Sequence, residues 1–317
     1  MASGRFAPSP TGDLHLGNLR TALLAWLFAR SSGGTFLVRM EDLDRVQASA
    51  EHEASQLRDL ESLGLDWDGE VVRQSDRFDR YEAAIGGLTA AGLTYPCYCS
   101  RREVREASAA PQGDQMMAYP GTCRALGPEE QARRDAAGGR PSLRLRADIG
   151  EVTVLDDLLG PISAVVDDVV LRRADGVPAY NLAVVVDDAA QGVEQVVRGD
   201  DLATSAPRQR HLASLLGLPP VRYAHVPLVL APGSGRLAKR DGAVTLADQA
   251  REGRDARAVA SLLAASLGLA RANEPVVPAD LVVRFDPTRL PQGPWTPGAW
   301  AFPSAKGDKS PENMPAD

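Results

Sequence analysis

The first forty residues constrain the fold most, because they indicate a strand, a loop, a helix and a second strand in close succession. Apolar residues recur at helical spacing over 16–30, between strand-like segments at 4–7 and 35–40. Two strands joined by a crossover helix form a βαβ unit, which requires a parallel sheet. The sequence therefore predicts an α/β fold.

The rest of the chain continues this alternation, with one interruption. Helices are predicted at 49–63, 75–91, 205–216, 246–252 and 257–267. Buried strands are predicted at 183–186, 195–198 and 225–230. Between them, short strands at 143–146, 152–155 and 165–172 are typical of an insertion in the parallel sheet.

Composition limits the class of protein. The 317 residues are 44% hydrophobic and 24% charged, as in ordinary globular chains. The net charge of −7 argues against a general nucleic-acid binder, so any contact with nucleic acid must come from a local patch. We find neither a long apolar span nor an apolar leader, and we expect a cytoplasmic protein that does not contact membranes.

The loop after the first strand is the first candidate site. Residues 8–18 lie at the carboxyl edge of the predicted sheet, where ligands bind, and immediately before a helix whose N-terminus attracts phosphate. His15 is placed to donate to a nucleotide phosphate, and Gly17 allows close approach to the backbone. The alternative is a loop with one surface histidine.

A basic loop at 235–242 is the second candidate site. It contains Lys239, whereas the only other lysines, Lys306 and Lys309, fall in the polar tail. A loop ammonium can close over a polyphosphate and stabilise the charge that develops on it. The alternative is a solvated charged turn.

These two segments resemble the paired signature motifs of class I aminoacyl-tRNA synthetases. The first is His15-Leu16-Gly17-Asn18 and the second is Arg236-Leu237-Ala238-Lys239-Arg240. Four further segments, at 5–12, 39–44, 180–188 and 197–202, are similar to the glutamyl-tRNA synthetase family. The resemblance extends from residue 5 to about 242, more weakly to 294, and implies a Rossmann-like catalytic domain.

The chain is short after Lys239, where full-length members of this family carry a helical anticodon-binding domain. In this it resembles truncated paralogues of the family. That resemblance implies a ligase that activates L-glutamate with ATP, with or without tRNA present, and then transfers it to the queuosine base at the wobble position of tRNA(Asp). The partner would be the anticodon stem-loop that bears queuosine. The alternative is a compact glutamyl-tRNA synthetase that charges a tRNA 3′ end.

The resemblance also implies the site residues. The catalytic residues would be His15 and Lys239, and Mg²⁺ would accompany the ATP. ATP would be bound by His15, Gly17, Asn18, Arg236, Leu237, Lys239 and Arg240. Glutamate would be bound by Arg5, Phe6, Ala7, Pro8, Ser9, Glu41, Tyr180 and Arg198.

Residue chemistry supports these assignments. Arginines hold carboxylates through paired hydrogen bonds, and Glu41 suits the ammonium of a bound glutamate. A simple structural ion pair between Arg5 and Glu41 is the alternative. The loop departs from the family pattern at Arg236 and Ala238, and the alanine lacks a hydroxyl that would bond phosphate.

Three cysteines indicate a metal site. Cys97, Cys99 and Cys123 are the soft ligands that zinc prefers, and an odd number of cysteines favours reduced thiols. The family resemblance implies that Tyr119 is the fourth ligand of one structural Zn²⁺. Three thiols without a metal are the alternative.

We expect five segments. Residues 1–92 and 175–234 would form the catalytic domain and 93–174 the insertion, with the zinc site in 93–124. Residues 235–300 would hold the basic loop and a helical stem-contact region, and 301–317 a disordered tail. Arginines that follow the cysteine pair or lie in the late helices are candidates for tRNA phosphate contacts: Arg101, Arg102, Arg105, Arg251, Arg254 and Arg257.

We expect a monomer. Two rival classes remain: a dinucleotide-dependent oxidoreductase, from the glycine pattern at 233–238, and a catalytically silent zinc or tRNA-binding module. The first is disfavoured because no helix is predicted to follow the glycines. The second is disfavoured because His15, Lys239, Arg5 and Glu41 are all present.

Overall fold

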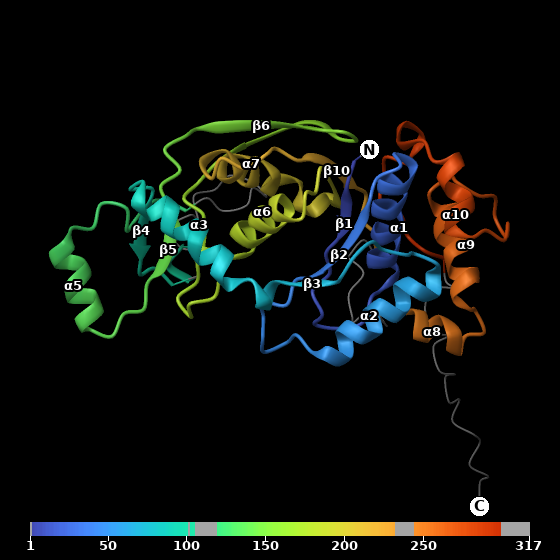
Figure 1. Cartoon of the computed structure of the whole chain (residues 1–317), viewed down its shortest axis with the longest axis horizontal. Coiled ribbons are helices and arrows are strands. Elements are labelled where there is room, and N and C mark those ends of the chain that lie inside the picture. Colours follow the sequence, from blue (N-terminus) through green and yellow to red (C-terminus); the bar gives the residue numbers. More distant parts are fainter. Residues whose placement is uncertain (1, 101, 105–118, 232–243, 299–317) are drawn as a thin grey trace, which may run out of the picture.

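A computed structural model describes residues 2–100, 102–104, 119–231 and 244–298, and it contains two sheets (Figure 1). The larger sheet has seven strands in the order β3-β2-β1-β9-β10-β6-β7. Its strands are β1 (Gly4–Phe6), β2 (Phe36–Met40), β3 (Val72–Arg73), β6 (Glu151–Asp156), β7 (Gly160–Val165), β9 (Gln195–Gly199) and β10 (Arg222–Val226).

All pairs in this sheet are parallel except β6 with β7. The predicted βαβ unit is confirmed: β1 and β2 pair directly, with Arg5 opposite Leu37, and α1 (Leu16–Ser31) connects them. The carboxyl ends of β1, β2 and β9 therefore meet at one edge, which is where a ligand site forms in an α/β fold.

Helices pack on the large sheet (Figure 1). Besides α1, they are α2 (Ala50–Leu63), α3 (Phe78–Ala90), α5 (Pro128–Ala136), α6 (Tyr180–Ala190), α7 (Ala206–Leu215), α8 (Leu246–Arg251), α9 (Ala256–Ser266) and α10 (Pro278–Leu281). Of these, α8 to α10 lie at one end of the molecule (Figure 1). The largest core cluster joins α1 to β1, β2 and α9, through fully buried side chains such as Leu19, Phe36 and Leu263. No helix in the described ranges is long and apolar enough to cross a membrane.

The prediction of a buried strand at 183–186 is wrong, because these residues belong to α6. A short apolar run cannot be distinguished from a buried helix by its periodicity. Tertiary contacts favour the helix. Its last turns place the buried carboxylates of Asp187 and Asp188 against arginines from other elements.

The prediction of one strand over 165–172 is also wrong. The chain leaves β7 at Val165 and enters β8 (Val170–Arg172) in a different sheet. Between them, Asp167 accepts from Tyr119 N and Asp168 accepts from Tyr95 and Ala147. These buried hydrogen bonds interrupt the strand.

The strand predicted at 225–230 corresponds to β10, which begins and ends earlier in the chain than predicted. Pro227 follows its last residue, and proline has no N–H to continue a ladder.

The second sheet is antiparallel, in the order β4-β5-β8, with β4 (Thr94–Cys97) and β5 (Ser142–Leu145). It lies with α5 at the end of the molecule opposite α8 to α10 (Figure 1). Residues 93–174 thus divide between both sheets, because β6 pairs with β10.

Candidate active site

A cavity of about 670 Å³ opens at the carboxyl ends of β1, β2 and β9. It brings together residues that lie far apart in the sequence. All eight residues expected to bind glutamate line it, and so do His15 and Asn18, which were expected to bind ATP: Arg5, Phe6, Ala7, Pro8, Ser9, His15, Asn18, Glu41, Tyr180 and Arg198.

His15 is the N-cap of α1. Its Nδ1 accepts from the backbone N–H groups of Gly17 at 3.0 Å and Asn18 at 3.3 Å, and the Asn18 side chain accepts from His15 N in return. Burial lowers the pKa of His15, so the ring is neutral at neutral pH. Because Nδ1 accepts, the ring proton is on Nε2, which is available to donate to a ligand at the positive end of the helix.

Gly17 makes this cap possible. A Cβ at this position would lie 2.8 Å from Cε1 of His15 and 2.9 Å from its Nδ1. Such contacts would displace the imidazole ring. Close packing against the histidine is thus a reason for glycine here, besides the approach of a nucleotide that the sequence predicted.

The basic loop lies outside the described residues, and with it Arg236, Leu237, Ala238, Lys239 and Arg240. The described chain resumes beside His15. Val244 O accepts from Leu16 N at 3.0 Å, and Thr245 forms a β-bridge with His15.

Arg5 is buried and ion-paired, but not to Glu41. Its Nε and Nη2 donate to the two carboxylate oxygens of Asp188 at 3.0 and 3.4 Å. Arg39 donates to the same carboxylate from Nη1 at 2.8 Å. Burial raises the pKa of Asp188, but the two guanidinium groups outweigh it and hold this pKa below its usual range. Asp188 therefore fixes the orientation of Arg5 and remains charged.

Glu41 follows β2 and accepts from Arg39 Nη2 at 3.4 Å. The alternative of an Arg5–Glu41 ion pair does not hold, since each residue pairs elsewhere. Burial raises the pKa of Glu41 despite the nearby charges of Arg39 and Arg5. A ligand ammonium at Glu41 would restore the preference for the charged carboxylate.

Arg198 differs from the other buried arginines of the site. It is 6% exposed, and its donors contact Nε2 of His225 at 3.0 Å, Gln209 at 2.8 Å and Ser205 at 3.0 Å. No carboxylate in the described part of the chain lies within ion-pair distance of it. A buried guanidinium without an anion is costly, so an anionic ligand is favoured at this position.

Four supporting residues were missed as site residues by sequence reasoning. Asp188 and its neighbour Asp187 hold the arginines behind Glu41, and Asp156 with His225 supports Arg198. The two aspartates fall in the segment that resembled the glutamyl-tRNA synthetase family, which was the only available signal. Nothing local indicated Asp156 or His225.

The cysteine cluster lies away from this cavity, around β4. The three sulfur atoms, of Cys97, Cys99 and Cys123, all lie within 4.8 Å of one another, and two of the cysteines are buried. Tyr119 Oη lies 3.3 Å from Cys97 Sγ and 3.6 Å from Cys99 Sγ. Three soft donors and a phenol at these separations can hold a metal ion. The fold thus unites all four predicted ligands.

The arginines predicted to meet tRNA phosphates come from different elements of the fold. Arg251 ends α8 beside Asp248, Gly253 turns the chain at φ 79°, and Arg257 lies on α9. Arg251, Arg254 and Arg257 therefore do not lie on one helix. Arg102 is exposed, whereas Arg101 and Arg105 lie outside the described ranges.

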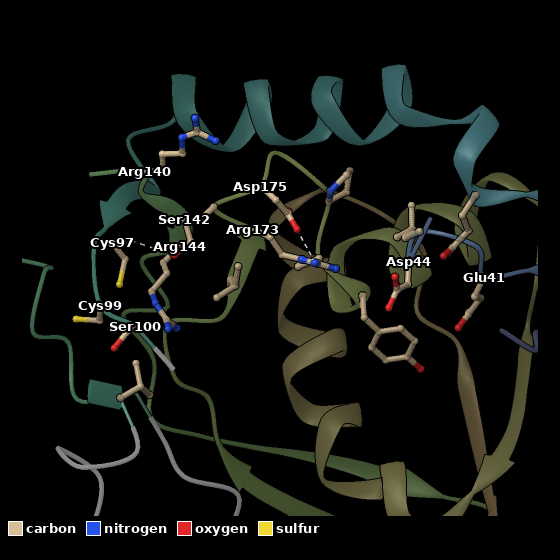
Figure 2. A pocket seen from close by; sticks show the side chains of 18 of the residues that line it. Glu41, Asp44, Cys97, Cys99, Ser100, Arg140, Ser142, Arg144, Arg173 and Asp175 are labelled. Carbon is tan, nitrogen blue, oxygen red and sulfur yellow. Dashed lines mark hydrogen bonds and ion pairs between the residues drawn. The ribbon is translucent and has the colours of Figure 1, made fainter. Parts of the chain in front are cut away.

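A second, larger cavity of about 1080 Å³ adjoins the first, and the two share Ser9, Glu41 and Tyr180. Figure 2 shows the larger cavity. From there it extends between the two sheets to Cys97 and Cys99. The candidate site is therefore a cavity that adjoins a second, larger one.

Comparison with known proteins agrees with this fold. The family model described as tRNA synthetases class I (E and Q), catalytic domain, matches residues 2–289. The chain belongs to this family.

Within the family, the chain is most usefully compared with two curated relatives, both named Glutamyl-Q tRNA(Asp) synthetase. The Nocardia farcinica protein is 62% identical over 92% of both chains, and the Symbiobacterium thermophilum protein is 47% identical over 93% of this chain and 95% of its own. The crystal structure of a glutamate-tRNA synthetase from Elizabethkingia anophelis matches with a TM-score of 0.79 and 26% identity. That match covers 95% of this chain and 68% of the other.

Proposed function

We propose that this protein activates L-glutamate with ATP and transfers it to the queuosine base of tRNA(Asp), as the names of its relatives indicate. The observation that carries the first step is Arg198, which is buried and has no carboxylate within ion-pair distance among the described residues. It shares a cavity with Arg5, Glu41 and the N-terminus of α1. This combination suits an amino acid with two carboxylates beside a nucleotide phosphate.

Glutamate binding follows from the charges. Arg198 and the remaining donor of Arg5 bind carboxylate oxygens, because guanidinium forms strong charge-assisted hydrogen bonds to carboxylates. Glu41 pairs with the substrate ammonium. Ser9 and Tyr180 provide hydroxyl groups at the mouth of the cavity.

ATP is bound where α1 begins. The Nε2–H of His15 and the positive end of the helix meet the phosphates, Gly17 and Asn18 border them, and Lys239 with Arg236, Leu237 and Arg240 completes the site from the loop. Mg²⁺, bound together with the nucleotide, would neutralise charge on the pyrophosphate.

The chemistry is positioning and charge stabilisation. An oxygen of the glutamate α-carboxylate attacks the α-phosphorus of ATP, and pyrophosphate leaves with the electron pair of the broken P–O bond. A carboxylate is already a nucleophile, so this step needs no general base. A hydroxyl of queuosine then attacks the activated carbonyl, forms the ester and releases AMP and a proton.

The cysteine cluster holds one structural Zn²⁺ in this proposal. Cys97, Cys99, Cys123 and Tyr119 offer four donors, which is the usual number for a closed structural zinc site. When bound, the ion ties β4 to the segment after Tyr119. No step of the reaction passes through it.

Radiolabelled glutamate tests the proposal. The protein receives ATP, Mg²⁺ and labelled glutamate, with tRNA(Asp) that contains or lacks queuosine, and the tRNA is then digested to nucleosides. Label on the wobble nucleoside, absent without queuosine, is expected. Label on a 3′-terminal adenosine would support the compact glutamyl-tRNA synthetase instead. Glutamate-dependent ATP–pyrophosphate exchange separates both from a silent binding module.

A further inference from the structure

The larger cavity has an uneven distribution of charge along its length. Acidic side chains, Glu41 and Asp44, lie at the end that joins the amino-acid site, and Arg140 and Arg144 lie at the far end beside Cys97 (Figure 2). Its walls come from different sheets. The acidic end follows β2 of the large sheet, and the basic end belongs to β5 and the residues before it.

Some charges in the cavity are already matched. Arg173 donates to Asp175 at 2.5 Å between the two ends. Arg144 donates to Asp168 O at 2.7 Å and lies 3.7 Å from the centre of the Tyr119 ring. Arg144 nevertheless has no carboxylate within ion-pair distance among the described residues, and its buried Nε has no hydrogen-bond partner.

Besides Arg144, two further charges in the cavity are left unmatched among the described residues. Asp44 is half-buried and accepts only from Val46 N at 3.2 Å and Gln47 Nε2 at 3.3 Å, so no cation neutralises it. Arg140 is exposed and forms no ion pair with any described residue. A ligand that fits this cavity therefore carries a positive charge toward the reaction site and a negative charge toward the small sheet.

Queuosine in an RNA has this polarity. A secondary alkyl amine links its base to the cyclopentene ring that carries the hydroxyls, and alkyl amines are protonated at neutral pH. Its phosphates are anionic and lie on the opposite side of the nucleoside. A 3′-terminal adenosine has no such cation.

We propose that this cavity binds the acceptor nucleotide, with Asp44 holding the amine of queuosine and Arg140 holding a phosphate of the anticodon loop. The proposal rests on the proposed function and adds residues that select the acceptor. Asp44 places the hydroxyls of the cyclopentene ring next to Glu41 and the activated glutamate. Arg140 contributes affinity without reading the base.

Binding of two RNA hairpins separates these roles. The probes are fluorescent anticodon stem-loops of tRNA(Asp) with either queuosine or guanosine at the wobble position, and anisotropy gives a Kd for each. We expect the wild-type protein to prefer the queuosine hairpin by about tenfold, as for one charge-assisted hydrogen bond. Asp44→Asn should bring the two Kd values together, whereas Asp44→Glu should restore part of the preference.

Arg140→Gln should weaken both hairpins by a similar factor of about fivefold and reduce the salt dependence of binding by about one unit of slope, as expected for one phosphate contact. The matched control is Asp79→Asn, an exposed carboxylate on α3 outside the cavity, which should change neither Kd. Thermal unfolding of each variant checks that the variant is folded.

Several outcomes overturn the inference. They are a wild-type protein that binds both hairpins equally, an Asp44→Asn variant that keeps the preference, and an Arg140→Gln variant that changes only the preference. The labelling experiment is independent of these binding measurements. If the wild-type protein esterifies queuosine but Asp44→Asn keeps the binding preference, the proposed function stands and this acceptor site is rejected.

Discussion

Arg198 donates from Nε to Nε2 of His225 at 3.0 Å, and this contact fixes the proton on the histidine. Because a guanidinium only donates, Nε2 must be the accepting nitrogen, and the ring proton is on Nδ1. Nδ1 then donates to Asp156 Oδ2 at 2.6 Å. Burial lowers the pKa of His225, which keeps the ring neutral. Asp156 and His225 are thus positioning residues for Arg198.

Substitution of His225 tests this relationship. Glutamine can keep an acceptor near the Nε2 position, whereas asparagine reaches only the Nδ1 position. We expect His225→Asn to raise the KM for glutamate in ATP–pyrophosphate exchange by about tenfold, the usual effect of one lost charge-assisted hydrogen bond, and His225→Gln to raise it less. Equal effects of the two variants would contradict a specific role for Nε2.

Asp188 should contribute to the unfolding free energy of the protein. Asp188→Asn leaves Arg5 and Arg39 buried without the carboxylate they share, and breaking such a buried pair costs about 3–5 kcal/mol. Urea denaturation measures this loss of unfolding free energy. The control is Glu82→Gln, which breaks the exposed pair with Arg172 and should cost less than about 1 kcal/mol. Similar losses in both variants would contradict the role assigned to burial.

His15 combines two roles that its variants can separate. Asparagine is a good N-cap but lacks an imidazole, whereas alanine supplies neither. We expect both variants to slow ATP–pyrophosphate exchange by about 100-fold, because a donor to the phosphate is lost. Only His15→Ala should also lose about 1 kcal/mol of unfolding free energy, from the missing cap. Exchange at the normal rate in His15→Asn would remove His15 from the catalytic residues.

The stability of the protein should depend on the protonation of Asp59. Burial, with the nearby charge of Asp13, raises the pKa of this carboxyl from 3.8 to about 6. The folded chain therefore binds this proton more tightly than the unfolded chain. The resulting stabilisation is present below about pH 4 and is lost as the pH rises through about 6.

Asp59→Asn should accordingly raise the unfolding free energy by about 1 kcal/mol above pH 6 and leave it nearly unchanged below pH 4. Denaturation at a series of pH values measures this difference. Glu61→Gln, an exposed change on the same helix, controls for the loss of one negative charge. A gain of the same size at every pH would exclude the proton linkage.

Metal content tests the cysteine cluster. We expect one zinc per chain by mass spectrometry, lost in Cys123→Ser. Tyr119→Phe should weaken retention against a chelator by about tenfold or more, because a donor beside two of the thiols is removed. Tyr98→Phe is the matched control, since its hydroxyl contacts Asp135 instead. Full retention in Tyr119→Phe would exclude the phenol as a ligand.

Local patterns in the sequence determined much of this protein. The helical spacing after Leu16 and the two flanking strands predicted the βαβ unit, and therefore the edge at which a site forms. The segment around His15 was also recognisable without a structure, because it lies between a predicted strand and a predicted helix and resembles a family motif. Periodicity and short motifs extend over a few residues, so a single sequence contains them.

Only the tertiary structure decided the partners of the arginines. Arg5 pairs with Asp188, 183 positions away, and Arg198 depends on His225 and, through it, on Asp156. Burial makes these pairings strong, yet burial depends on which elements pack together, and no local pattern contains that information. The same reason made α6 look like a strand. Its apolar run fits either element, and the arginines that pair with its buried aspartates come from distant parts of the chain.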